Sequence, residues 1–265
     1  MEQYIVYSQT FQDPNLGEYS IQFISPPAAT VKLITYTCGA KSVMAMLTNA
    51  YTGDYSGVSL DEDRMQLMLE DIQRTKLQTP MEMIHMVWLI QNVTRAFTHQ
   101  LVRYRVGTAF VQESMRFLGH KGIYKVLATR KVLNKIGEDE VTKIENAYFE
   151  GAIAAIRSYV KLIGTGVPSE DARGVLPTNI LTNIYFDCSL RTLQNICAQR
   201  LCCQAQPGEW QPILVKMRAL IAGYLGPEIE ATIRAPYELG QDCGFRASFD
   251  RPCIWKREKS EREEP

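Results

Sequence analysis

The sequence predicts an α+β fold in which helices pack on a mixed β-sheet within a single domain. Short segments rich in β-branched and aromatic residues, which are typical of strands, are interspersed with longer segments whose apolar residues recur at helical spacing. No internal repeat and no Gly/Ser-rich linker divides the 265 residues. Residues 256–265 contain no apolar side chain and are expected to be disordered, which leaves residues 1–255 for the domain.

The first part of the chain is expected to form strands and then two helices. Residues 3–36 alternate in patches between apolar and polar side chains and are interrupted by prolines, which predicts two or three strands. Residues 39–51 have apolar side chains at helical spacing. Asp61 or Glu62 can begin a second helix, which is expected to end near Thr75.

The middle of the chain is expected to contain a buried strand that leads into a helix. The apolar run of residues 85–93 predicts a strand that is buried on both faces. Thr94 can cap the helix that follows this strand. Residues 110–117 are expected to be extended, whereas residues 121–135 are basic and show no regular pattern.

The second half of the chain is expected to be mainly helical. Residues 139–164 carry one apolar stripe at helical spacing, and Gly164 ends it. The remaining predicted elements are, in order, a short helix bounded by prolines at 167–177, a strand at 182–187 and helices at 189–202 and 212–223.

Composition limits the classes of function that this chain can have. The net charge is zero, with 46% hydrophobic and 22% charged residues, so no overall charge attracts nucleic acid or a membrane. No stretch approaches the roughly 20 apolar residues of a membrane span, and the first residues do not resemble a signal peptide. The seven cysteines are odd in number and mostly embedded in apolar segments, which indicates free thiols in the cytoplasm.

Several common kinds of active site are not expected. The three histidines are scattered and no HxxxH or CxxC motif occurs, so no metal site is predicted. Cys188, Cys197 and Cys202 lie on or beside an apolar helix, where cysteine usually acts as a small hydrophobic residue. GxSxG, GxGxxG and GxxxxGK[ST] motifs are also absent, so any nucleotide must be held by side chains.

Arginines in apolar surroundings are the main candidates for binding. Residues 99–116 contain Arg103, Arg105 and Arg116 among apolar side chains. Arginine offers a planar fork of donors that matches phosphate and carboxylate, so this segment predicts an anion site. A partly buried network of ion pairs would have the same composition, and this alternative stays open.

The helix predicted at residues 189–202 carries polar side chains on opposite sides. Arg191 and Asn195 are four residues apart and share a face. Arg200 points roughly the opposite way at about 100° per residue. This arrangement suits a helix between two ligands or two subunits, but the spacing alone favours a half-exposed helix with surface arginines.

The order of motifs resembles the flavin-dependent thymidylate synthases over residues 30–225. The family pattern is TPFEH, a strand, RQ-x-x-RHR, S-x-R, GVP-x-x-xAR-x-xLP and N-x-R-x-x-x-N-x-x-x-x-R. The corresponding segments here are TPMEM, HQLVRYR, QESMR, GVPSEDARGVLP and SLRTLQNICAQR. The resemblance implies an α+β fold and a homotetramer in which several chains build each active site. It further implies FAD as cofactor, NADPH as hydride donor and transfer of a one-carbon unit from methylenetetrahydrofolate to C5 of dUMP, giving dTMP.

The resemblance also implies a role for each motif residue. Residues expected to contact the flavin are Thr79, Arg103, Tyr104, Arg105, Ser189, Arg191 and Asn195. Residues expected to bind dUMP are Gln100, Arg103, Gln112, Ser114, Met115, Arg116, Arg173 and Arg200. Ser114 and Arg116 would hold the phosphate, and Arg200 would be the catalytic residue. A fixed cation beside N3 and O2 stabilises the negative charge that strengthens C5 as a nucleophile.

Five departures from the family pattern concern the flavin and pyrimidine motifs. Tyr104 stands where the family has His and is expected to stack on or hydrogen-bond the flavin. Eight residues separate Arg105 from Ser114, one more than the family usually has. The other departures are Gln112 for a frequent Glu, Ser189 for an Asn and Gln204 for a frequent His. Two alternatives therefore stay open: a homologue that makes a different C5-modified pyrimidine nucleotide, such as a hydroxymethyl product, and a non-catalytic nucleotide-binding homologue.

Overall fold

The computed structural model describes most of the chain, which divides into two compact units. The described residues are 5–24, 29–55, 61–75, 78–116, 122–127, 138–201, 208–235 and 238. The first unit comprises Met1–Thr30, Ile90–Arg103 and Val111–Tyr185, and the second comprises Val31–Leu89, Tyr104–Phe110 and Phe186–Pro265. Residues 256–265, the predicted disordered tail, lie outside the described residues, and the single domain over residues 1–255 stays a prediction.

Strands and helices are interspersed along the chain, which confirms the predicted α+β class. The strands are β1 (Ile5–Asp13), β2 (Gly17–Ile24), β3 (Thr30–Tyr36), β4 (His85–Thr94), β5 (Thr108–Gln112), β6 (Ile123–Leu127) and β7 (Leu181–Ser189). The helices are α1 (Ala40–Asn49), α2 (Glu62–Arg74), α3 (Arg95–Leu101), α4 (Glu138–Gly164), α5 (Ser169–Ala172), α6 (Leu190–Arg200), α7 (Trp210–Tyr224) and α8 (Pro227–Ala231). Short 3-10 helices are η2 (Ala50–Thr52), η3 (Thr79–Glu82) and η5 (Arg173–Val175).

The strands form two sheets rather than the one mixed sheet that the sequence predicts. The first sheet has the order β1-β2-β6 and the second has the order β3-β4-β7-β5. In the first sheet β1 and β2 are antiparallel, whereas β2 and β6 are parallel, so this sheet is mixed. Asp13 holds the turn between β1 and β2, because its Oδ1 accepts hydrogen bonds from the backbone N–H groups of Asn15 and Leu16.

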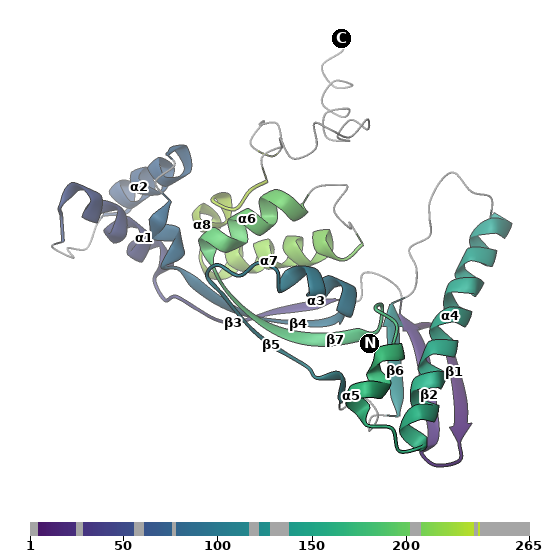
Figure 1. The fold of residues 1–265 in the computed structure, drawn as a ribbon. Coiled ribbons are helices and arrows are strands. Elements are labelled where there is room, and N and C mark those ends of the chain that lie inside the picture. Colours follow the sequence, from purple (N-terminus) through teal and green to yellow (C-terminus); the bar gives the residue numbers. More distant parts are fainter. Residues whose placement is uncertain are drawn as a thin grey trace, which may run out of the picture. The chain divides into compact units, whose positions relative to one another are not determined.

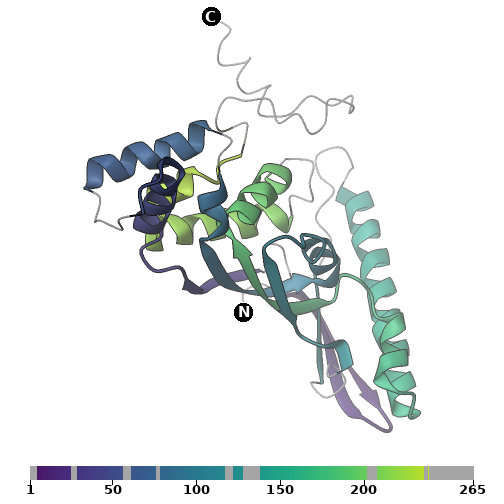
Figure 2. The same ribbon diagram turned by 60° about the vertical axis from the view of Figure 1, so that its left-hand side comes forward.

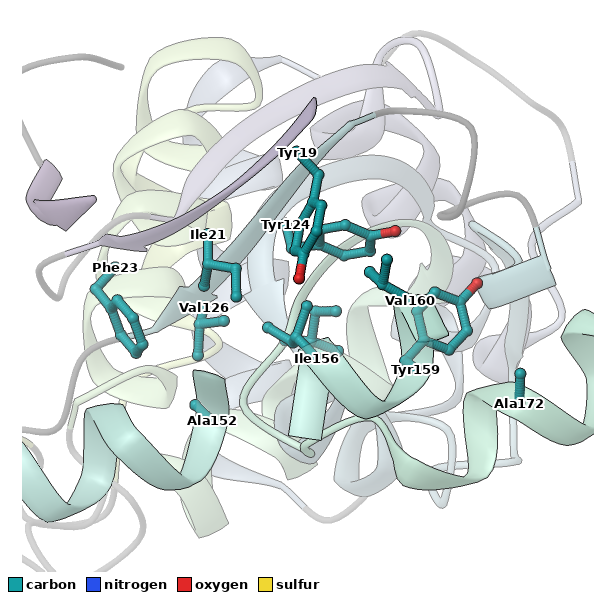
Figure 3. Close-up of a cluster of buried hydrophobic side chains, with 11 residues drawn as sticks. Tyr19, Ile21, Phe23, Tyr124, Val126, Ala152, Ile156, Tyr159, Val160 and Ala172 are labelled. Carbon is teal, nitrogen blue, oxygen red and sulfur yellow. The ribbon is translucent and has the colours of Figure 1, made fainter. Parts of the chain in front are cut away.

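Helix α4 covers the three-stranded sheet of the first unit (Figure 1). Its buried residues Ala152, Ile156, Tyr159 and Val160 recur at helical spacing, as the apolar stripe predicts. Figure 3 shows these side chains facing Tyr19, Ile21 and Phe23 of β2 and Tyr124 and Val126 of β6. The rings of Tyr124 and Tyr159 meet edge to face, with centroids 6.0 Å apart. This cluster is the hydrophobic core of the first unit.

In the second unit, helix α8 contacts α1, α2 and α7 (Figure 1, Figure 2). Helices α1 and α2 pack against each other, and α7 packs against α6 and α8. Asp61 caps α2, because its Oδ1 accepts a hydrogen bond of 2.8 Å from the N–H of Arg64. Trp210, Ile213, Leu214, Met217 and Ile221 are the buried residues of α7.

Most of the predicted elements are confirmed, but some details of the predictions are wrong. Strand β6 lies within residues 121–135, where the sequence shows no regular pattern. In the middle of β4, Met86, Trp88 and Ile90 are buried and the residues between them are half-buried, so the strand is not buried equally on both faces. Strand β5 ends at Gln112, short of the predicted extended segment 110–117. The short helix predicted at 167–177 is two elements, α5 and η5.

In the part of the chain that the structure describes, no helix is both long enough and apolar enough to cross a bilayer.

Candidate functional site

Two arginines that are predicted to bind the nucleotide both contact one glutamate in the first unit. Arg116 Nη2 lies 3.1 Å from Glu170 Oε1, and both side chains are about half exposed, at 52% and 49%. Arg173 Nε donates a hydrogen bond of 3.1 Å to the backbone oxygen of the same Glu170. Arg116 follows β5, whereas Glu170 and Arg173 belong to α5 and η5. The fold therefore brings together two arginines that are far apart in the sequence.

The segment that precedes Arg116 is held in place by its own polar contacts. Gln112 Nε2 donates a hydrogen bond of 2.7 Å to Thr98 Oγ1 in α3, and Ser114 Oγ accepts one of 3.3 Å from the N–H of Arg116. Met115 packs against the hydrophobic core of the first unit. Backbone and side-chain contacts thus hold the segment that carries Arg116 in place.

Gln100 and Arg103 lie at the end of α3 in the same unit. Thr94 caps this helix, as predicted, because its Oγ1 accepts a hydrogen bond of 3.0 Å from the N–H of Phe97. Gln100 is half-buried, and Arg103 is exposed just after the helix. Within the described residues, the guanidinium of Arg103 has no hydrogen bond or ion pair, so it is available to an anionic ligand.

Arg95 is a candidate binding residue that lies outside the sequence motifs. Its Nη2 donates a hydrogen bond to the backbone oxygen of Glu113, directly before Ser114. Burial lowers the pKa of Arg95, the charge of Glu113 opposes this change, and the nearby charge of Arg173 adds to it. Its Nε is buried without a hydrogen-bond partner among the described residues. A cation at the first position of a helix is electrostatically unfavourable, and this was the one sequence signal that could have identified it.

Glu113, which Arg95 contacts, belongs to a small polar network. Asn183 Nδ2 donates a hydrogen bond of 3.0 Å to Glu113 Oε2, and Asn183 Oδ1 accepts one of 3.2 Å from the N–H of Asn92. Asn92 has a positive φ of 57°, an uncommon conformation for a residue with a side chain. Asn183 therefore links the strained end of β4 to the segment that carries Ser114 and Arg116.

The second unit contains the arginine that is expected to face the uracil ring. Arg200, at the end of α6, donates from Nε to the hydroxyl oxygen of Tyr104 at 3.0 Å. That hydroxyl donates to Gln199 Oε1 at 2.8 Å. The guanidinium carbon of Arg200 lies 4.8 Å from the centre of the Trp210 ring. Tyr104 thus contacts the predicted catalytic arginine, and its predicted contact with a flavin stays a prediction.

Ser189 caps α6, and its backbone N–H donates a hydrogen bond to Gly107 in the loop that carries Tyr104 and Arg105. Its Oγ accepts a hydrogen bond of 3.1 Å from the N–H of Thr192, which makes it the helix cap. Thr192 Oγ1 donates to the backbone oxygen of Val106 at 2.7 Å. Gly107 has a φ of +62°, and a Cβ there would lie 3.0 Å from both Ser189 Oγ and Thr192 Oγ1. The Ser189 side chain is buried in this contact, and its predicted role toward a cofactor stays a prediction.

The other predicted flavin contacts of the second unit lie on α6, η3 and the loop after Tyr104. Arg191 is half-buried, and its Nη1 donates a hydrogen bond of 2.7 Å to Gln194 Oε1. Asn195 is exposed one turn further along α6, and Thr79 is exposed on η3, which contacts α6. Arg105 is exposed and forms no ion pair within the described residues. A free cation and neutral amide and hydroxyl donors fit the anionic diphosphate and polar ring edge of a flavin dinucleotide.

Two of the described cysteines are poorly suited to nucleophilic catalysis. Cys188 and Cys197 are buried, and burial raises the pKa of both thiols, that of Cys197 to about 12. Cys38 is exposed. Cys202 and Gln204 lie outside the described residues. Among the residues that are described, no group of three or more His, Cys, Asp or Glu side chains is placed to hold a metal ion.

Comparison with known proteins identifies one family. A family model described as "Thymidylate synthase complementing protein" matches residues 32–223. A flavin-dependent thymidylate synthase of Sulfurisphaera tokodaii is 33% identical over 180 residues, which are 66% of this chain and 67% of that protein. A protein of the same name from Geobacter sulfurreducens is 30% identical over 213 residues, covering 74% of this chain and 87% of that protein. The match to a third, from Saccharolobus solfataricus, covers 66% of that protein's length, slightly under two thirds.

A solved structure shares the fold. It is a UMP/dUMP methylase, PolB, from Streptomyces cacaoi, bound with 5-Br dUMP. It superimposes with a TM-score of 0.64 at 18% identity and covers 78% of this chain and 95% of its own. At this identity the likeness supports the α+β architecture only.

Proposed function

Because this chain belongs to the flavin-dependent thymidylate synthase family, we propose that it transfers a one-carbon unit from methylenetetrahydrofolate to C5 of dUMP, giving dTMP. FAD is the proposed cofactor and NADPH the proposed hydride donor. The observation that carries the proposal is the meeting of Arg116 and Arg173 at Glu170, which supports a phosphate site. The family resemblance implies that both arginines contact the nucleotide.

The proposed phosphate site uses contacts that are easily exchanged. The Arg116–Glu170 pair is half exposed, and pairs of this kind contribute only about 0–1 kcal/mol to stability. A nucleotide phosphate carries more charge than a carboxylate and can replace Glu170 as the partner of Arg116. Arg173 Nη groups and Ser114 Oγ are the further proposed donors, and Gln112 and Met115 shape the segment that carries them.

The proposed catalytic contribution of the protein is electrostatic. Arg200 holds a positive charge beside N3 and O2 of the uracil ring, where it stabilises the anion that makes C5 more nucleophilic. Arg105, Arg191, Asn195 and Thr79 are the proposed flavin-binding residues, and Arg103 and Gln100 contact flavin or nucleotide. When bound, the flavin supplies the hydride and one-carbon chemistry, so the protein needs no nucleophile of its own. The buried, weakly acidic thiols of Cys188 and Cys197 are consistent with this division of roles.

We also propose a homotetramer with shared active sites in the cytoplasm. The support for shared sites is that α6 presents Arg191 and Asn195 on one side and Arg200 near its end on another. The free thiols of Cys38, Cys188 and Cys197 agree with a reducing compartment.

A second candidate function is a related reaction that gives a different C5-modified pyrimidine nucleotide. The observation that favours it is the contact of Tyr104, which replaces the family histidine, with Arg200 at the proposed uracil position. A change beside the reacting ring can alter which nucleotide or which one-carbon product is accommodated.

Release of tritium from C5-labelled dUMP tests the proposed function. With FAD, NADPH and methylenetetrahydrofolate present, the protein should release tritium, and Arg173→Gln should raise KM for dUMP. Arg74→Gln is the matched control, because Arg74 is an exposed arginine that pairs only with Asp71 among the described residues. Absence of release with all components present would argue against alkylation of dUMP, and a dTMP product would exclude the second candidate.

A further inference from the structure

Tyr104, Gln199 and Arg200 form a hydrogen-bond chain with a fixed direction. A guanidinium can only donate, so the 3.0 Å contact from Arg200 Nε uses a lone pair of the Tyr104 hydroxyl. The Tyr104 hydroxyl then donates its single proton to Gln199 Oε1, 2.8 Å away. The amide oxygen of Gln199 can only accept. No other arrangement of protons satisfies both contacts, so the chain orients all three side chains at once.

Trp210 restrains the same guanidinium from a second direction. The guanidinium carbon of Arg200 lies 4.8 Å from the centre of the Trp210 ring, within the range of a cation–π contact. Trp210 is buried, so its ring is held by the surrounding core. The Tyr104 and Trp210 rings meet nearly at right angles, with centroids 6.3 Å apart. The Arg200 guanidinium is therefore held between a hydroxyl group and an aromatic face.

Tyr104 is itself held firmly enough to position another residue. Thr108 Oγ1 donates a hydrogen bond of 2.7 Å to the backbone oxygen of Tyr104. The same loop is held against α6 at Gly107, where an added Cβ would lie 3.0 Å from Ser189 Oγ and Thr192 Oγ1. The hydroxyl of Tyr104 thus belongs to a restrained side chain on a restrained loop.

We propose that Tyr104 is a positioning residue for Arg200, whose guanidinium it orients so that the two Nη groups face the pyrimidine ring of the substrate. The Nε group is engaged by Tyr104, while neither Nη group has a hydrogen-bond partner among the described residues. A planar guanidinium fixed at Nε presents its two Nη groups in a defined plane, which suits the adjacent N3 and O2 atoms of uracil. Preorganisation of this kind favours the reaction because the cation does not have to reorient as charge develops. This inference rests on the proposed function and adds a role for the residue that departs most clearly from the family motif.

The variant Tyr104→Phe tests the proposal, because it removes only the hydroxyl oxygen. We expect kcat to fall at least about tenfold, the effect of losing one hydrogen bond to a charged group, while KM for dUMP changes less than about threefold because phosphate binding is unaffected. Tyr55→Phe is the matched control, since Tyr55 is 81% exposed. Thermal melting and the flavin absorbance of each variant show whether fold and cofactor binding are retained.

A binding measurement gives a readout that does not depend on turnover. The N3 proton of bound 5-fluoro-dUMP can be titrated by ultraviolet difference absorbance. A well-placed Arg200 favours the N3 anion, so we expect the apparent pKa of N3 to rise by about one unit in Tyr104→Phe, equivalent to a tenfold change. A role of Tyr104 in folding alone would leave this value unchanged in the protein that remains folded.

A double-mutant cycle with Gln199 distinguishes positioning from an independent effect. Gln199→Met removes the acceptor of the Tyr104 proton, and we expect it to lower kcat in the wild-type background but not in Tyr104→Phe. Equal effects of Gln199→Met in both backgrounds, or an unchanged kcat in Tyr104→Phe, would overturn the inference and leave the proposed reaction intact. If Tyr104→Phe raises the apparent pKa of N3 but the wild type releases no tritium, the proposed reaction is refuted and the positioning role of Tyr104 is retained. Failure of the wild type to bind 5-fluoro-dUMP would overturn both.

Discussion

Replacement of Glu170 by glutamine should strengthen the binding of dUMP. Glu170 is the only described partner of the Arg116 guanidinium, at 3.1 Å, and it competes with the phosphate for that cation. Glutamine keeps the size of the side chain and the backbone oxygen that Arg173 uses. The perturbation therefore removes one negative charge and leaves the surrounding geometry unchanged.

The size of the effect follows from the exposure of the pair. Two unit charges about 4 Å apart in water interact by about 1 kcal/mol, and exposed pairs typically measure 0–1 kcal/mol. With side chains 52% and 49% exposed, the upper part of this range is the limit. We therefore expect Glu170→Gln to lower the dissociation constant of dUMP roughly two- to fivefold at low salt. The gain should shrink as ionic strength rises, because exposed charges are screened over about 10 Å at 0.1 M.

Isothermal titration calorimetry with dUMP and with deoxyuridine measures this effect. Deoxyuridine lacks the phosphate, so its affinity should not change in Glu170→Gln. Asp171→Asn is the matched control, since it removes a neighbouring carboxylate from the same short helix without touching Arg116. Competition between Glu170 and the phosphate would be refuted if dUMP bound Glu170→Gln no more tightly than wild type. It would also be refuted if both variants showed the same change in affinity for both ligands.

Three further predictions concern other parts of the chain. Ile156→Ala should lower the free energy of unfolding by about 2–5 kcal/mol, measured by urea denaturation, because Ile156 is fully buried in the core of the first unit; an effect under 1 kcal/mol would contradict that packing. Arg95→Met should raise KM for dUMP roughly tenfold with a smaller change in kcat, because Arg95 holds the backbone oxygen directly before Ser114; unchanged steady-state kinetics would remove this role. Gly107→Ala should lower both the melting temperature and kcat, since it combines a positive φ with contacts of 3.0 Å to Ser189 and Thr192; a fully active, equally stable variant would show that the loop is not tightly fastened to α6.

The parts of the fold that could be predicted are those with a long local pattern. Helix α4 could be predicted because its apolar stripe recurs over many turns. The helix caps Asp61 and Thr94 could be predicted because a cap hydrogen bond involves only neighbouring residues. Strand β6 has only five residues and owes its place to parallel pairing with β2, a contact between distant segments. Such pairing leaves no periodic signal long enough to detect, which is why residues 121–135 look irregular in the sequence.

In the candidate site, too, contacts between distant segments could not be predicted from the sequence. Arg116, Arg173 and Arg200 could be proposed as site residues because their motifs resemble those of a family. Arg95 lies in no recognised motif, and its proposed role depends on contacts that involve Glu113 and Asn183, which come from other segments of the fold. Tyr104 is visible in the sequence as a departure from the family pattern, but its contact with Arg200 depends on the end of α6 and could not be read from spacing.

The mass of the product nucleotide tests the central claim most directly. Purified protein incubated with dUMP, FAD, NADPH and methylenetetrahydrofolate should yield a nucleotide heavier than dUMP by one methylene unit, with the chromatographic behaviour of dTMP, and omission of any component should abolish it. A product of different mass would mean that the chain catalyses a related C5 modification. Unchanged dUMP in the complete mixture, from protein that binds both flavin and dUMP, would contradict the account.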